Sequence, residues 1–137
     1  MHFNTPQEAE TAFYAAFAEA DIEAMMAVWA NDDTISCVHP LGQRLDGHAA
    51  VRQSWQNLFK HSPKMQFVLN ETRQWQGLDL AIHLVHEHIR IGQNQEFQAP
   101  MVTTNVYRRS NNSWHMISHH ASPSPQAKLT MLSPVLH

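Results

Sequence analysis

The hydrophobic pattern of the chain changes its period once, between Lys60 and Met65, and this change constrains the fold more than any other feature. Before it, apolar residues recur three and four positions apart, as on one face of a helix. After it, apolar and polar residues alternate, as in strands. Helices followed by successive hairpins indicate an α+β protein, in which the helices pack on one face of an antiparallel sheet.

Three helices are expected in the first half of the chain. The alanine-rich segment Pro6–Ala20 carries one apolar stripe at helical spacing. A second helix is expected after Asp21, whose side chain can cap it, and a third between Asp46 and Lys60. Between the last two helices, the β-favouring residues Thr34–Val38 predict a short strand.

Four strands are expected in the second half, because alternating runs are separated by polar turns. The expected strands are Met65–Trp75, Leu80–Ile91, Gln95–Arg109 and Ser113–Ala121. The segment Ser122–Pro125 then ends the regular structure. We therefore expect a single domain over residues 1–123 and a C-terminal tail over residues 124–137.

The composition excludes several classes of function. The chain has 137 residues, enough for one core, and a net charge of -3 with scattered basic residues, so nucleic acid is not an expected partner. No apolar run is long enough to span a bilayer and the N-terminus lacks a signal-peptide pattern, so a cytoplasmic protein without membrane attachment is expected. The single Cys37 cannot form an internal disulfide. The chain has 11 histidines, and because histidine titrates nearest to neutral pH, we expect any catalytic proton transfer to involve them.

Short segments with the order and spacing of a known superfamily cover most of Pro6–Pro123. They are Phe13–Asp21, Val28–Asp33, Val38–Gly42, Gly47–Val51, Ala99–Pro100, Thr104–Arg109 and Trp114–Pro123. The chain resembles the nuclear transport factor 2-like superfamily, in particular its SnoaL-like and ketosteroid-isomerase-like domains. The resemblance implies a cone-shaped (cystatin-like) fold: a curved antiparallel sheet with N-terminal helices packed on its concave face, one small-molecule pocket, and a homodimer through the convex face. That superfamily includes isomerases, cyclases, dehydratases, hydrolases and non-catalytic binding domains, so the resemblance leaves the reaction open.

His39 is the candidate catalytic residue. It precedes Pro40, where ketosteroid isomerase has an aspartate that acts as the general base, and a neutral imidazole can accept a proton near pH 7. The isomerase's two hydrogen-bond donors, a tyrosine and a protonated aspartate, correspond to Phe13 and roughly to Thr104, which cannot supply the same donors. The alternative for His39 is a structural role, as a cap of the turn or as the partner of a nearby aspartate.

Four further residues are candidate ligand contacts: Trp29, Trp55, Asn105 and His120. Both tryptophans lie on apolar helical faces, where core packing is the alternative. Asn105 lies in a central strand and faces either a pocket wall or a dimer surface. His119 and His120 cannot both enter the pocket, because neighbouring strand residues point to opposite faces. His120 shares a face with Trp114 and Met116, and the resemblance to the superfamily implies that this face points inward, so His120 is the expected pocket residue.

His86 and His88 share one face of a strand, as histidine pairs in metal sites do. The sequence defines no third ligand, so surface pairing is the expected role and neither a metal nor another cofactor is predicted; a metal site is the third alternative.

The expected function is acid/base proton transfer, of the isomerase, cyclase or lyase type, on a small apolar carbonyl compound. The alternative is a non-catalytic ligand-binding or dimerisation module of the same fold. Proton chemistry predicts a polar, solvent-connected cavity at His39, whereas the module predicts a filled cone and a large apolar dimer face.

Overall fold

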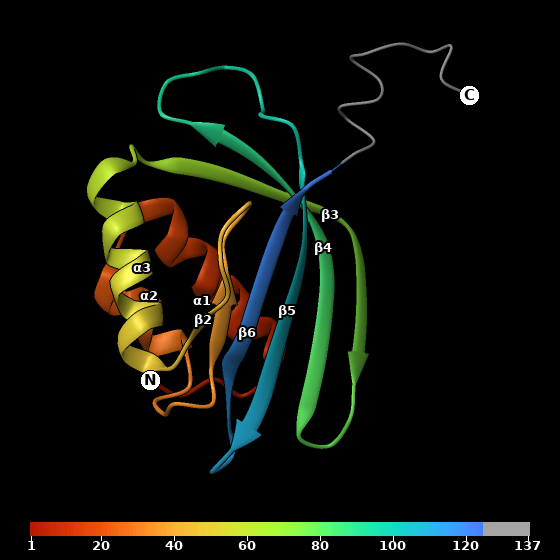
Figure 1. Ribbon diagram of the computed structural model, residues 1–137. Coiled ribbons are helices and arrows are strands. Elements are labelled where there is room, and N and C mark those ends of the chain that lie inside the picture. Colours follow the sequence, from red (N-terminus) through yellow and green to blue (C-terminus); the bar gives the residue numbers. More distant parts are fainter. Residues whose placement is uncertain (125–137) are drawn as a thin grey trace.

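The computed structural model describes residues 1–124, which form three helices on one face of a six-stranded sheet (Figure 1). The helices are α1 (Pro6–Glu19), α2 (Ile22–Val28) and α3 (His48–His61). The strands are β1 (Ser36–Val38), β2 (Leu45–Asp46), β3 (Met65–Gln76), β4 (Leu80–Ile91), β5 (Met101–Ser110) and β6 (Ser113–Pro123). The predicted α+β class, with helices first and hairpins afterwards, is confirmed.

The strand order of the sheet is β2-β1-β6-β5-β4-β3. The four long strands pair in an antiparallel manner, as predicted, whereas β1 pairs in parallel with β6. The sheet is therefore mixed. The parallel pairing joins residues about eighty positions apart (Ser36 to Ser118), so no local pattern could predict it.

The helices begin where side chains can satisfy their first backbone N–H groups. Thr5 accepts a hydrogen bond from the Glu8 N–H, and Asp21 accepts one from the Ala24 N–H at the start of α2. At α3 the preceding residue is a glycine, and the Asp33 carboxylate accepts from the His48 N–H at 3.1 Å. Asp33, which lies in the connection between α2 and β1, thereby caps the first turn of α3.

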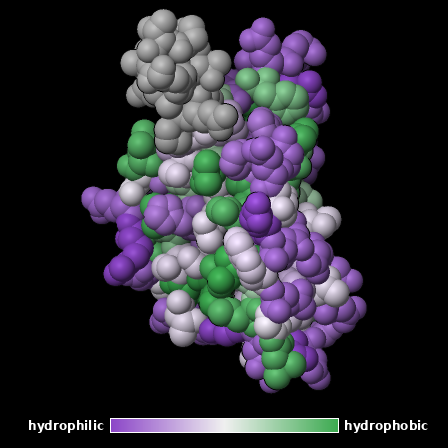
Figure 2. Space-filling view, turned by 90° about the vertical axis from the view of Figure 1, so that its right-hand side faces the viewer, coloured by the Kyte–Doolittle hydropathy of each residue, from purple (hydrophilic) through white to green (hydrophobic). Residues whose placement is uncertain are grey.

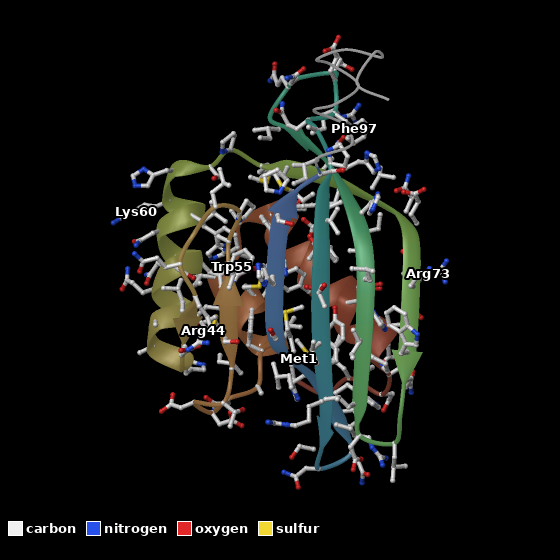
Figure 3. All side chains as sticks on the ribbon, turned by 45° about the vertical axis from the view of Figure 1, so that its right-hand side comes forward. Met1, Arg44, Trp55, Lys60, Arg73 and Phe97 are labelled. Carbon is white, nitrogen blue, oxygen red and sulfur yellow. The ribbon has the colours of Figure 1, made fainter. Side chains whose placement is uncertain are left out.

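The core lies between the helices and the inner face of the sheet, and aromatic side chains fill it. Phe13 and Phe17 of α1 meet Trp55 of α3 edge to face, with ring centroids 5.6 and 4.8 Å apart. Figure 3 shows Trp55 pointing from α3 toward the sheet, whereas Lys60 of the same helix and Arg73 of β3 point away from the core. Burying each large apolar side chain stabilises the fold by roughly 1.5–3 kcal/mol.

Strand β6 contains a β-bulge that changes which residues face the core. Val106 pairs with Ser118 and Tyr107 with Met116, so Ile117 is an extra residue on β6. Two residues that oppose one on the partner strand break the alternation of faces. The inner face is occupied by Trp114 and Met116 before the bulge and by His119 and Ala121 after it.

The prediction that His120 faces inward is therefore wrong. It assumed uninterrupted alternation from Trp114, whereas the extra residue Ile117 shifts the pattern by one position. His120 is exposed on the outer face, and His119, 1% exposed, takes the inner position.

Three features of the strands also differ from prediction, and the first is that β6 ends at Pro123 rather than at Ala121. Strand β5 begins at Met101 rather than at Gln95, and the short strand β2 was not expected. Most of the predicted tail lies outside the described residues. None of the helices in residues 1–124 combines the length and apolar character that crossing a membrane requires.

Candidate functional site

A pocket of about 350 Å³ lies at the end of the sheet where β4 ends and β5 begins. Apolar side chains from α1, α3 and the four long strands form most of its wall; four polar side chains complete it. The apolar residues are Phe17, Pro40, Leu58, Met65, Ile89, Ile91, Met101 and Ala121, and the polar ones are His39, Glu87, Gln98 and His119. Such a concave, mostly apolar space with a few convergent polar groups is typical of small-molecule sites.

A larger hollow of about 660 Å³ lies on the outer face at the bulge of β3, beside Arg73 and Trp75. It is a more open depression, and two of its polar groups, His86 and Glu71, already pair with each other at 2.8 Å. The less open pocket on the inner side gathers buried titratable groups, so we place the candidate site there.

His39 follows β1 directly and is held in the pocket wall by α3. Its Nε2 lies 3.0 Å from the Ser54 Oγ, which donates its own proton to the Val51 carbonyl at 2.7 Å. Because that proton is already used, Ser54 accepts a hydrogen bond from the His39 Nε2–H. This leaves Nδ1 as the nitrogen that can accept a proton.

Burial lowers the pKa of His39, so its ring is neutral near pH 7. The ring packs edge to face against Trp55, with centroids 4.7 Å apart. Among residues 1–124, no aspartate contacts its ring: Asp33 caps α3, and Asp32 pairs with Arg108. The structure therefore does not support the proposed aspartate partner of His39.

Cys37 has a histidine neighbour that the sequence did not reveal, because its Sγ lies 3.7 Å from the His39 Nε2. Burial raises the pKa of the Cys37 thiol to about 12. At neutral pH the thiol is therefore protonated, and a thiolate nucleophile is not available there.

A chain of buried hydrogen bonds runs across the inner face from β4 to β6. The Tyr14 hydroxyl lies 2.5 Å from a Glu87 oxygen and accepts from the Asn105 Nδ2 at 2.9 Å. The Asn105 Oδ1 in turn lies 2.6 Å from the His119 Nδ1. Both ends of the chain, Glu87 and His119, line the pocket.

Burial disfavours the charged form of both ends, so it shifts the pKa of the acid Glu87 upward and the pKa of the base His119 downward. Burial raises the pKa of Glu87 to about 7, an effect that the hydrogen bond from Tyr14 partly opposes. Burial, together with His39 and His120, lowers the pKa of His119 to about 3. At neutral pH the pocket thus contains two neutral histidines and a carboxyl group that exchanges its proton.

The model of the SnoaL-like domain family matches residues 7–126. The chain belongs to the SnoaL-like domain family. The F-box protein SKIP8 of Arabidopsis thaliana is 29% identical over 112 residues, or 82% of this chain and 46% of that protein. The chain spans about half the length of this curated relative.

Two solved structures extend the comparison. A domain assigned provisionally as a calcium/calmodulin-dependent protein kinase type II association domain, from Thiobacillus denitrificans, is 40% identical with a TM-score of 0.87, covering 90% of this chain and 98% of that one. A provisional dehydratase of the nuclear transport factor 2-like family, from Streptomyces avermitilis, is 30% identical with a TM-score of 0.77, covering 87% and 93%. The predicted superfamily is therefore confirmed.

In this SnoaL-like domain, the structure brings only part of the predicted site together. His39 lines the pocket, and Asn105 lies on the inner face, one hydrogen bond behind the pocket wall. Trp55 contacts the rings of both His39 and His119 but is not among the pocket-lining residues. Trp55 therefore packs behind the two histidines that form part of the pocket wall.

Trp29 and His120 do not take the predicted positions. Trp29 directly follows α2, is 1% exposed, and is not among the residues that line the pocket. We correct its assignment from ligand contact to core packing. His120 lies on the outer face of β6, because of the bulge at Ile117.

Sequence reasoning missed Glu87, Tyr14 and His119. The comparison with ketosteroid isomerase pointed to Phe13, but it is the hydroxyl of the next residue, Tyr14, that enters the buried chain. Thr104 faces the outer side of the sheet, in register with the outward-facing His120. One signal was available for Glu87: it lies at even spacing from Ala81 and Val85, whose apolar character marks the buried face of β4.

The remaining histidines of β4 are engaged elsewhere. The buried His83 pairs with Glu10 at 2.8 Å. His86 pairs with Glu71, and His88 contacts Asn70 at 3.0 Å. Within residues 1–124, no group of three or more His, Cys, Asp or Glu side chains is arranged to hold a metal ion.

Proposed function

We propose that this SnoaL-like domain binds a small, largely apolar carbonyl compound in the inner pocket and moves a proton on it by acid/base catalysis without a cofactor. The observation that carries the proposal is the meeting of a neutral His39 and a Glu87 with a pKa of about 7 in one mostly apolar pocket. Acid/base catalysis is most effective when the pKa of the group lies near the working pH.

The two groups suit complementary roles. His39 Nδ1 accepts the proton from the carbon beside the carbonyl, and the protonated form of Glu87 delivers a proton to the oxygen or to another carbon of the same compound. Because the Tyr14 hydroxyl occupies Glu87 Oε2, the exchanging proton sits on Oε1. The apolar wall strengthens both transfers by excluding water.

The test is exchange of the hydrogens beside the ketone of 2-decalone with D₂O, followed by proton NMR. His39→Ala is expected to lower the exchange rate by a factor on the order of 10² to 10⁴. His39→Asp should recover part of it, because a carboxylate is also a base. His88→Ala, which removes a histidine from the outer face, is the matched control. Equal rates in wild type and both His39 variants would contradict the assignment.

A second candidate function is self-association through the outer face of the sheet. Trp75, Ile82 and Val106 lie in register across β3, β4 and β5, and Trp75 is 53% exposed. Figure 2 shows hydrophobic residues near the middle of this face, with hydrophilic ones around them. A single layer of helices covers only the inner face, which leaves this row for a second copy of the chain. The 40% identity to a provisional association domain supports this candidate.

A further inference from the structure

When Glu87 is ionised, the hydrogen-bond chain behind the pocket has one direction, which follows from counting the protons of its members. A Glu87 carboxylate oxygen can only accept, so the single proton of the Tyr14 hydroxyl points to it across 2.5 Å. The Tyr14 oxygen must then accept from Asn105, which turns the amide Nδ2 toward it. When Glu87 is protonated on Oε1, its Oε2 still accepts from Tyr14, and the direction is unchanged.

The amide group of Asn105 carries this hydrogen-bond direction on to His119. With Nδ2 facing Tyr14, Asn105 presents its Oδ1 to His119, and an amide oxygen only accepts. The His119 Nδ1 therefore carries the proton of this 2.6 Å hydrogen bond. Since the buried ring is neutral, its Nε2 carries none and is a hydrogen-bond acceptor.

We propose that Asn105 is a positioning residue that holds His119 as a hydrogen-bond acceptor in the pocket wall, so that the pocket selects compounds with a hydroxyl or N–H donor. His119 lines the pocket and its Nδ1 is occupied by Asn105, so Nε2 is the ring nitrogen left to meet a ligand. A carbonyl oxygen placed there would face a lone pair, whereas a hydroxyl would be bound.

This inference rests on the proposed small-molecule function and narrows it. The substrate would carry two polar groups: a carbonyl near His39 and Glu87, and a hydroxyl or N–H donor at His119. An apolar hydroxy-carbonyl compound meets both conditions. A buried acceptor left without a donor is unfavourable, so a compound without one should bind more weakly.

The first measurement is the tautomer of His119 by ¹⁵N NMR of the ring nitrogens at pH 8.5, without ligand. The wild type is expected to show a protonated Nδ1 and an unprotonated Nε2. In Asn105→Leu, which removes the acceptor, the Nδ1–H form should lose its dominance. Asn70→Leu is the matched control, because it removes a similar Asn–His contact on the outer face and should leave His119 unchanged. A protonated Nε2 in the wild type would overturn the inference, even if Asn105→Leu fails to fold.

The second measurement compares the affinities of 2-decalol and 2-decalone by NMR titration. The wild type and Asn70→Leu should bind the alcohol about tenfold more tightly than the ketone, and Asn105→Leu should lose this preference. The expected tautomer without a preference for the alcohol would overturn the ligand class. If neither probe binds the wild type, the proposed function fails, and the tautomer measurement still decides the role of Asn105.

Discussion

At the scale of single residues, burial sets the chemistry of this pocket more than charge pairing does. Desolvation moves the pKa of Glu87 up and that of His119 down, toward the uncharged form of each. The same effect keeps the Cys37 thiol protonated. Near pH 7, Cys37 and His119 are therefore uncharged and Glu87 exchanges its proton, which suits a site for an apolar compound.

Glu87 should make stability fall as the pH rises. The folded protein keeps the Glu87 proton up to about pH 7, whereas the unfolded chain releases it near its ordinary pKa of 4.5. Between these values the folded state binds more protons, so the free energy of unfolding decreases with pH, by on the order of 3 kcal/mol in total. His119 contributes the opposite slope, since its folded pKa of about 3 lies below its ordinary value of 6.5.

The variant Glu87→Gln isolates the first contribution, because His119 is present in both proteins. The free energy of unfolding of Glu87→Gln relative to wild type should rise between pH 4.5 and 7 and stay level above pH 7. Urea unfolding at several pH values measures it. Glu96→Gln, in the exposed β4–β5 connection, is the control and should follow the wild-type curve. A pH-independent difference for Glu87→Gln would show that the carboxyl group titrates normally.

At the scale of elements, the bulge of β6 allows Trp114 and His119, which lie on either side of it, to face the same side of the sheet. Deletion of Ile117 should leave every pair of the β5–β6 register in place, because Met116 and Ser118 already oppose consecutive residues of β5. His119 therefore remains on the inner face. The cost should be limited to the partly buried Ile117 side chain, on the order of 1–2 kcal/mol.

Deletion of His115, in the regular part of β6, is the comparison. It brings Trp114 next to Met116, so one of these two buried residues must turn outward. Thermal unfolding should show a small loss of stability for the Ile117 deletion and a large one, or no folded protein, for the His115 deletion. Equal losses would mean that the bulge itself is needed for the twist of the sheet.

At the scale of the whole molecule, the sheet separates two surfaces with different proposed uses. The inner face, with α1, α2 and α3, encloses the pocket, and the outer face presents the apolar row Trp75, Ile82 and Val106. Substitutions on the outer face should therefore affect association without changing the pocket.

Sedimentation velocity at micromolar concentration tests the association. The wild type is expected to form a dimer, and Trp75→Lys should raise its dissociation constant at least tenfold, because a charge would be buried in the interface. Leu78→Lys is the matched control: Leu78 is 78% exposed in the β3–β4 turn, at the edge of this face. A monomeric wild type, or equal weakening by both variants, would contradict association through this row.

The sequence by itself determined the types and order of the main elements. Helical and alternating periods depend only on neighbouring residues, so α1, α3 and β4 could be located, and β4 was predicted with its observed bounds. The start of α2 also followed from a local signal, the Asp21 cap. His39 became a candidate because it precedes Pro40 at the end of a predicted strand, where the similar ketosteroid isomerase has its catalytic aspartate.

Only the tertiary structure decided which polar residues meet in the pocket. Tyr14 and Glu87 are 73 positions apart, and their contact depends on the packing of α1 on the sheet. His119 replaced His120 because one extra residue in β6 reversed the alternation, and such a bulge is defined by the pairing with β5. Local patterns specify elements, whereas burial, and with it the pKa of Glu87 and the tautomer of His119, is a property of distant segments packed together.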